Sequence, residues 1–353
     1  MSKRTEIDGV QLLRAIAVLL VVLDHVEGMF AMPKYFGILF AGGFFSAGTV
    51  GVDLFFVISG FIITYVTEGL DTKRNSPRAF AIRRFCRIIP FLWLCVMTHY
   101  LTRALSVGNI DFMPYGRAIL LYPVGTVSPS QVWTLRHEVF FYLMVAISLY
   151  GRRFLPILAV FLALPILWAL VDSAYAQAPE GRDWFTGLFN LRANTAFGTG
   201  LIVGLAFRNK ITIKYRSWLN WALIIAAPVL LLVMAHLISK SIILTPIYST
   251  LIVDCICAIC LLVSLTITVQ TLIERSLMLI GSASYSIYLT HDAAISASGI
   301  ILTRMHMESI LISVMLTIVT CILVGIAIHL SIERWMVRVS RRLLENSSED
   351  NRS

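Results

Sequence analysis

Long apolar segments recur along the whole chain, and they limit its possible folds more than any other feature. Each is about 18 to 25 residues long, which is the length that an α-helix needs to cross the hydrocarbon core of a bilayer. Hydrophobic residues make up 58% of the 353 residues and charged residues only 14%, so few of these segments have the polar face of a soluble helix. The sequence therefore predicts an all-α, polytopic transmembrane helix bundle of about ten spans, at residues 12–30, 50–68, 88–105, 133–150, 154–172, 192–207, 218–239, 247–270, 277–302 and 309–331.

The rest of the chain shows no sign of a second domain. Arg14 interrupts the first apolar run, and no clean small-residue cleavage site follows it, so we expect this span to be retained. Residues 1–335 are predicted to form one integral-membrane domain, followed by a polar cytoplasmic tail at 336–353. The apolar stretch at 117–125 is too short to cross a bilayer and is expected to be re-entrant or interfacial.

The distribution of lysine and arginine predicts the orientation of the bundle. With the N-terminus in the cytoplasm, 20 of the 29 basic residues fall in inner segments and 6 fall in outer loops. Because basic residues concentrate in cytoplasmic loops, both termini are predicted to be cytoplasmic, in a multi-pass protein of the cell inner (plasma) membrane. The net charge of +9 is explained by this distribution, and we expect no nucleic-acid partner.

The six cysteines indicate neither a disulfide framework nor a metal centre. Cys255, Cys257 and Cys260 lie in an apolar run that contains no histidine. Buried thiols are therefore expected there, and we expect no metal cofactor.

Two ionisable residues in the first span indicate where chemistry could take place. Arg14 and His25 are eleven residues apart, so both are predicted to project from one helix face, at depths about 16 Å apart. An arginine near the end of a span can extend to the membrane surface, whereas His25 and its neighbour Asp24 lie deeper. Intramembrane ionisable groups usually face a bundle interior or a water-filled cavity.

Three other spans place polar residues at a comparable depth: Asp53 in the second, Glu138 in the fourth and His291 in the ninth. A layer of histidines and carboxylates can carry acid/base chemistry or form a transport path. The alternative is an interhelical hydrogen-bond network that only stabilises the bundle. Chemistry or transport is favoured, because such groups inside a membrane are costly.

Arginines at the start of the third span indicate a phosphate site. Arg84 and Arg87 are one helical turn apart, a spacing at which two guanidinium groups can bind phosphate oxygens. The positive-inside rule alone would also place arginines here, and it is the favoured explanation for them taken by themselves. The polar path from Arg14 towards His25 supports a donor with a phosphorylated head and a long, thin arm.

Five motifs occur along the chain: Arg-x10-His (Arg14, His25), GVDLFFVISGF at 51–61, Arg-x-x-Arg (Arg84, Arg87) before IIPFLW, WTLRHEVFFY at 133–142, and YSIYLTH at 285–291. Taken together, they resemble the acyltransferase-3 family of integral-membrane O-acyltransferases. They occur in the family's order and cover the chain from the first span to near residue 335. The lack of an appended esterase-like domain makes the chain most similar to the single-domain members that acetylate exopolysaccharides.

This resemblance implies an activity and a role for each residue. Family members commonly transfer acetyl from acetyl-CoA, on the cytoplasmic side, to a hydroxyl group of a carbohydrate. By the resemblance, His25 is the catalytic residue. The other roles implied are CoA phosphate binding for Arg14, Arg84 and Arg87, and acceptor binding for Trp133, Tyr285, Tyr288 and His291.

His25 is expected to act as a neutral imidazole, either as a general base or as a transient acyl carrier, and the sequence leaves both roles open. A neighbouring carboxylate would orient the ring. Asp24 is adjacent in sequence but points about 100° away along the helix. Asp53 or Glu138, from another span, is therefore expected to be the better partner.

The sequence thus predicts a membrane O-acetyltransferase that uses acetyl-CoA. The expected acceptor is a glycan or glycolipid: an exopolysaccharide, an O-antigen or a lipid-linked precursor. The alternative is a transporter or flippase of a glycan precursor, with the polar layer as its translocation path. Transporters usually show an inverted repeat and broken helices in both halves, and neither is visible in the sequence.

Overall fold

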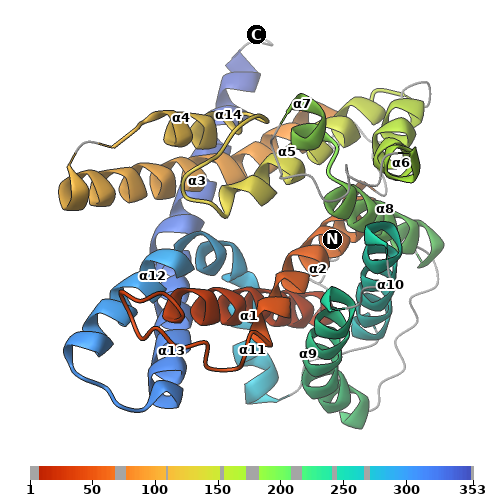
Figure 1. Ribbon diagram of the computed structural model, residues 1–353. Helices are drawn as coiled ribbons and strands as arrows, with labels where there is room; N and C mark the ends of the chain where they lie inside the picture. Colours follow the sequence, from red (N-terminus) through yellow and green to blue (C-terminus); the bar gives the residue numbers. More distant parts are fainter. Residues whose placement is uncertain are drawn as a thin grey trace. The chain divides into compact units, whose positions relative to one another are not determined.

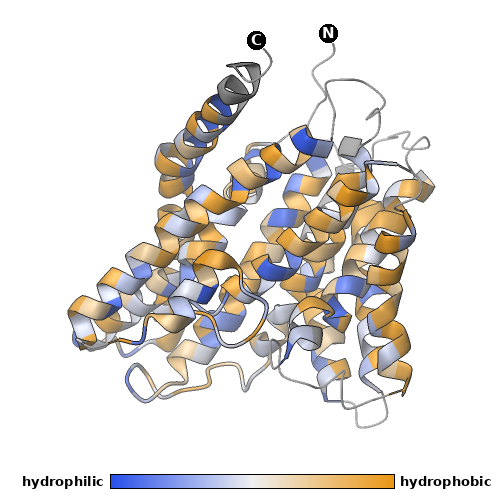
Figure 2. Ribbon diagram, turned by 90° about the horizontal axis from the view of Figure 1, so that it is seen from above, coloured by the Kyte–Doolittle hydropathy of each residue, from blue (hydrophilic) through white to orange (hydrophobic). Residues whose placement is uncertain are grey.

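Helices make up the regular structure of this protein. A computed structural model describes residues 8–67, 77–108, 110–151, 155–171, 183–207, 217–240, 245–265 and 271–350, and it contains no β-strand among them (Figure 1). The prediction of an all-α fold is therefore confirmed. Apolar residues dominate most of these helices, as the colouring in Figure 2 shows.

Every predicted span overlaps a helix. Among the described residues, four helical segments are long and apolar enough to cross a bilayer: Asp8–Phe30, Phe45–Tyr65, Pro246–Ser264 and Ile310–Leu343. The total of about ten spans stays a prediction. The helices that match the predicted spans are α1 (Asp8–Phe30), α2 (Val50–Thr67), α3 (Pro77–Val107), α5 (Val132–Ser148), α6 (Leu155–Val171), α8 (Leu191–Phe207), α9 (Ser217–Ser239), α10 (Pro246–Ser264), α12 (Ser284–Arg304) and α13 (Ile310–Ile328).

The orientation of the bundle also stays a prediction. Many of the basic residues on which it depends lie outside the described residues, at positions 3–4, 73–74, 152–153, 182 and 208–216. The structure of the described helices does not by itself identify the cytoplasmic side.

The chain divides into two compact units. The first comprises Met1–Tyr65 and Ala196–Ala327, and the second comprises Val66–Thr195 and Ile328–Ser353. Both include residues of the predicted membrane domain at 1–335, so its being a single domain stays a prediction. The remaining elements are η1 (Phe45–Thr49) and α11 (Leu272–Ser282) in the first unit, and α4 (Met113–Leu120), α7 (Trp184–Leu188), the π-helical turn η5 (His329–Glu333) and α14 (Arg334–Asp350) in the second.

Helix α1 lies at the centre of the first unit. It packs against η1, α9, α10, α11 and α12. Its sequence is apolar around most of its circumference, as expected for a helix surrounded by others, and Leu13, Ala17 and Val22 are fully buried. The polar residues of α1 are consequently brought into the interior of this unit.

Glycines allow helices of the first unit to touch through backbone atoms. A Cβ placed on Gly281 of α11 would lie 1.9 Å from the carbonyl oxygen of Gln11 in α1. A Cβ on Gly60 of α2 would lie 2.3 Å from the carbonyl oxygen of Phe197 in α8. Such close approach at small residues is typical of packed membrane helices.

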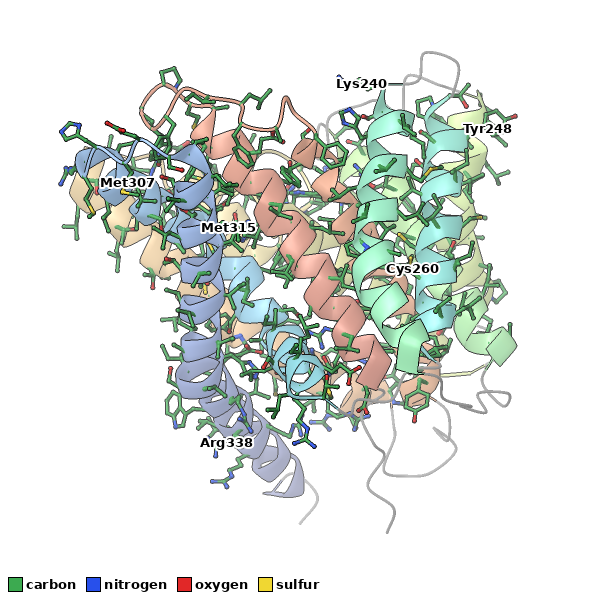
Figure 3. The ribbon with its side chains drawn as sticks, turned by 90° about the horizontal axis from the view of Figure 1, so that it is seen from below. Lys240, Tyr248, Cys260, Met307, Met315 and Arg338 are labelled. Carbon is green, nitrogen blue, oxygen red and sulfur yellow. The ribbon has the colours of Figure 1, made fainter. Side chains whose placement is uncertain are left out.

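Helices α9 and α10 form an antiparallel pair in the first unit. Figure 3 shows Lys240, which follows α9, and Tyr248, near the start of α10, at the same end of this pair. Cys257 and Cys260 of α10 are buried and Cys255 is exposed, and all three are free thiols. The expectation of buried thiols holds for two of these three residues.

One carboxylate organises the segment between α1 and α2. Glu27 accepts hydrogen bonds from the backbone amides of Ala41, Gly43 and Phe45, at 3.0, 3.0 and 2.7 Å. Its side chain is 1% exposed. This segment thus returns to the start of α2 along a defined path.

In the second unit, helix α3 packs against α4, α5 and α14. The indole Nε1 of Trp93 donates to the carbonyl oxygen of Ile119, at 3.0 Å. A cavity of ≈ 920 Å³ lies between α3, α5, α7 and the segment after α4. Its lining is mostly apolar, with Arg84 and Arg136 as its charged members.

Three segments differ from the prediction. The ninth span is two helices, α11 and α12, which meet at Ala283 with φ −84° and ψ 0°. A single residue in that conformation interrupts a helix without changing the hydropathy of the segment, so the apolar pattern did not predict the break. The third begins at Pro77 rather than near residue 88, since its arginines continue the helix. The stretch at 117–125 forms the end of α4 and then a loop that starts at Leu121, with φ 50°.

Candidate functional site

Two histidines from different helices meet in the first unit. His25 of α1 and His291 of α12 lie with their ring centroids 4.6 Å apart and their planes perpendicular. His291 is fully buried, whereas the side chain of His25 is 31% exposed. The His25 imidazole is therefore accessible and packs against the inaccessible imidazole of His291.

Backbone carbonyls fix the tautomer of both rings. Nδ1 of His25 lies 2.9 Å from the carbonyl oxygen of Val21, and Nδ1 of His291 lies 2.6 Å from that of Tyr288. A carbonyl oxygen only accepts, so Nδ1 carries the proton in each ring. When each imidazole is neutral, its lone pair is therefore on Nε2.

Each histidine is followed in the chain by an aspartate that lies close to it. Asp24 Oδ2 is 3.5 Å from Nδ1 of His25, and Asp292 Oδ1 is 3.3 Å from Nε2 of His291. Asp24 was expected to point away from His25, but a side chain one residue away can swing its carboxylate back across the helix surface. Asp292 was not predicted as a site residue, and its adjacency to His291 was the only signal that could have found it.

We refer to His25, His291 and Asp292 as the histidine cluster. One potential ligand atom from each of the three lies within 4.8 Å of the others. The carboxylates of Asp24 and Asp292 are 18% and 22% exposed. His25 and the two aspartates are thus partly exposed, whereas His291 is not.

Aromatic residues continue from the cluster along α12 and α2. The ring of Tyr288 lies 5.8 Å from that of His291 and 6.2 Å from that of Phe55 in α2. Asp53, two residues before Phe55, is 3% exposed. Its pairing with His25 stays a prediction, as does an acceptor-binding role for Tyr285, Tyr288 and His291.

Arg14 contacts the same helix as His25. Its guanidinium donates to the hydroxyl of Ser284 in α12 at 2.8 Å and to Oε1 of Gln11 at 3.4 Å. Both predicted polar residues of α1 therefore face α12, as their spacing of eleven residues predicted. Arg14 is buried, at 8% exposure, and its role in CoA binding stays a prediction.

The other predicted site residues belong to the second unit. The guanidinium carbon of Arg84 lies 4.9 Å from the ring centroid of Tyr142 and 5.4 Å from that of Phe80, within cation–π range. Tyr142 also donates to Oε1 of Glu138 at 2.5 Å. Arg84, Tyr142 and Glu138 thus form one chain of contacts between α3 and α5.

Two further residues of the second unit complete the predicted set. Arg87 lies one turn after Arg84 on α3 and is partly exposed. The ring of Trp133 lies 5.8 Å from that of His137. The predicted roles in phosphate binding and acceptor binding stay predictions for both residues.

The sequence is similar to known proteins over almost its whole length. The sequence model of a family described as "Acyltransferase domain" matches residues 7–329. The exopolysaccharide production protein ExoZ of Rhizobium meliloti (strain 1021) is 35% identical over 144 residues, which are 37% of this chain and 44% of ExoZ. The peptidoglycan O-acetyltransferase OatA of Listeria monocytogenes is 37% identical over 93 residues, 26% of this chain and 12% of OatA.

A longer alignment is found with YrhL of Bacillus subtilis (strain 168). It is 24% identical over 361 residues, which are 92% of this chain and 54% of YrhL. The chain thus spans about half or less of the length of these curated relatives. No solved structure matches the chain.

Proposed function

Because this chain belongs to the acyltransferase domain family, which it matches over residues 7–329, we propose that it is a membrane O-acetyltransferase. The proposed donor is acetyl-CoA in the cytoplasm, and the proposed acceptor is a hydroxyl group of a cell-surface or exported glycan. His25 is proposed as the catalytic residue and the inner membrane as the location. The observation that carries this proposal is the geometry of His25, a partly exposed imidazole with Nδ1 bound to a carbonyl oxygen.

That geometry suits a general base. With Nδ1 holding a proton, the lone pair of Nε2 can accept the proton of the acceptor hydroxyl as its oxygen attacks the thioester carbonyl. The tetrahedral intermediate then expels the CoA sulfur, which takes the proton back from the imidazolium and leaves as the free thiol. The products are an acetyl ester and CoA.

Asp24 and His291 both support this role for His25. A carboxylate oxygen 3.5 Å from Nδ1 stabilises the positive charge that the ring gains during proton transfer. The perpendicular ring of His291 limits rotation of the His25 side chain, which keeps the base in position. Both contacts come from residues of the first unit.

On the donor side, Arg84 and Arg87 are the proposed phosphate ligands. Arg84 is held by the rings of Phe80 and Tyr142, so its guanidinium starts from a defined position. Replacing Arg84 by alanine is expected to raise the KM for acetyl-CoA more than it lowers kcat, since phosphate contacts remote from the thioester contribute mainly to binding.

The acceptor class rests on the names of the relatives. ExoZ is named for exopolysaccharide production and OatA for peptidoglycan O-acetylation. We propose a polysaccharide or its lipid-linked precursor as the acceptor of this protein. A transporter of such a precursor is the competing function.

Comparison of the glycans made by a deletion strain carrying wild-type protein, His25→Ala or no protein tests this function. Loss of the acetyl mass increments in the last two strains, with the normal polymer yield, is expected. Loss of the polymer itself would indicate transport instead. His306→Ala removes an exposed imidazole outside the histidine cluster and serves as the matched control, with acetylation like that of the wild type. Wild-type acetylation by His25→Ala would contradict the proposal.

A further inference from the structure

The histidine cluster has the composition of a metal site. Two imidazoles and one carboxylate offer one ligand atom each, all within 4.8 Å of one another. This donor set is used for first-row divalent transition metals in proteins. The 3.3 Å between Nε2 of His291 and Oδ1 of Asp292 is close to the separation of about 3 to 3.5 Å expected for two ligands at 2.0–2.2 Å from one ion.

His291 supplies a second, independent observation. Its side chain is fully buried, and among the described residues no hydrogen-bond donor faces Nε2. The tautomer places a lone pair on this atom, and the nearest charged oxygen, of Asp292, is also an acceptor. Two acceptors 3.3 Å apart, one of them fully buried, repel each other unless a proton or a metal cation lies between them.

The Nδ1 atom of each ring has the kind of partner that is expected for a metal-binding histidine. Such histidines almost always donate their second ring N–H to a backbone carbonyl or a carboxylate, which fixes the ring and strengthens the ligand. His25 donates to the carbonyl of Val21 and His291 to that of Tyr288, at 2.9 and 2.6 Å. The Nε2 lone pairs of both histidines are thus oriented by the same kind of hydrogen bond and can bind a metal ion.

The local charge also fits a divalent cation. Asp292 contributes one negative charge as a ligand, and Asp24, 3.5 Å from Nδ1 of His25, contributes a second next to it. Two carboxylates balance a double positive charge, which lowers the cost of placing the ion within a helix bundle. The partial exposure of His25 and Asp292 leaves a path by which an ion can enter.

We propose that His25, His291 and Asp292 bind a divalent transition-metal ion of the zinc class, and that the bound ion inhibits the protein. The ion takes the lone pair of His25 Nε2, which the proposed reaction needs to accept a proton. Metal binding stands on the cluster alone, whereas the inhibition rests on the proposed function. The ion is an inhibitor here and has no part in the acyl transfer.

Zinc binding by the purified full-length protein in detergent tests the first part. The protein carries an affinity tag without histidines, is stripped with a chelator and is titrated with Zn²⁺, with Mg²⁺ as a hard-cation comparison. One zinc per chain is expected. Asp292→Asn, which preserves the shape of the side chain, and His291→Ala are expected to weaken binding at least about 100-fold, since losing a ligand costs more than losing a residue behind it.

His306→Ala is the matched control, because it removes an exposed imidazole and should bind zinc like the wild type. Co²⁺ in place of zinc should give visible absorption bands in the wild type that Asp292→Asn lacks. Thermal unfolding confirms that each variant is folded. Equal zinc affinity in the wild type and Asp292→Asn, or no stoichiometric binding by the wild type, would overturn the proposal.

Acetyl transfer measured with and without Zn²⁺ tests the second part. Reversible loss of activity, restored by a chelator, is expected at the zinc concentration that fills the site. Zinc that binds without inhibiting would refute the inhibition but leave the proposed function standing. Normal activity of His25→Ala would refute the proposed function but leave the metal site standing.

Discussion

At the level of single residues, Glu27 illustrates how a buried charge can organise a loop. Its carboxylate accepts three backbone N–H groups from residues 41, 43 and 45. Glutamine at this position would offer one acceptor oxygen and turn an NH₂ group towards amides that also donate. We expect Glu27→Gln to destabilise the protein by about 1–3 kcal/mol, the cost of leaving buried donors unpaired.

Thermal unfolding of the purified protein measures this effect. Glu308→Gln makes the same chemical change at an exposed position and should stay within about 0.5 kcal/mol of the wild type. Equal unfolding temperatures for Glu27→Gln and the wild type would show that the loop does not depend on this carboxylate.

Asp24 offers a second residue-scale prediction. If its carboxylate stabilises the His25 imidazolium, Asp24→Asn should lower kcat about 10-fold, equivalent to about 1.4 kcal/mol of transition-state stabilisation. The KM for acetyl-CoA should stay unchanged, because Asp24 is not among the proposed phosphate ligands. Steady-state kinetics with acetyl-CoA checks both values, and an unchanged kcat would assign Asp24 a purely structural role.

Residue spacing predicted the site only in part. The eleven-residue interval correctly placed Arg14 and His25 on one face of α1, since helical periodicity alone determines that relation. The positions of Asp24 and Asp292 depend on side-chain rotation and on the packing of α1 against α12. The depth of His25 and His291 was predicted from helical rise, but no periodic pattern contains the side-chain rotations that bring the two aspartates to the rings.

At the level of helices, packing depends on glycines that tolerate no side chain. Gly281→Ala would place a Cβ 1.9 Å from the carbonyl oxygen of Gln11, so α11 would have to move away from α1. We expect a loss of about 1–3 kcal/mol in stability, the usual cost of overpacking.

Gly28→Ala is the matched control for this change. Gly28 lies on α1 with no atom within 4 Å of its added Cβ, so alanine there should leave stability unchanged or raise it by up to about 1 kcal/mol. Thermal unfolding of both variants makes the comparison. Equal stability of Gly281→Ala and Gly28→Ala would show that the close approach of α11 to α1 does not limit the stability of the protein.

Helix positions were predicted better than helix boundaries. The apolar runs located the long apolar helices because the composition of a membrane-competent segment is averaged over many residues. They did not locate α14, which is polar and lies almost entirely in the predicted tail. The break between α11 and α12 depends on the backbone of Ala283 alone. Likewise α3 continues through its arginines back to Pro77, since long arginine side chains remain helical while their stems cover apolar neighbours.

At the level of the whole molecule, the orientation in the membrane is the prediction that most needs a measurement. The positive-inside distribution predicts cytoplasmic termini and an outer loop around His306. Green fluorescent protein fused after Ser353 should fluoresce, and alkaline phosphatase fused after His306 should be active. The opposite pair of results would invert the predicted topology and place Arg84 and Arg87, the proposed phosphate ligands, on the side away from cytoplasmic CoA.

The contacts of α1 with α12 bear on the kind of motion that the protein can use. Arg14 binds Ser284, and eleven residues further along α1 His25 rests on His291, about 16 Å away by helical rise. A shift of α1 along α12 by a single helical turn would break both contacts at once. A motion in which α1 and α12 move together keeps both contacts, whereas a motion that slides one helix along the other separates the two histidines.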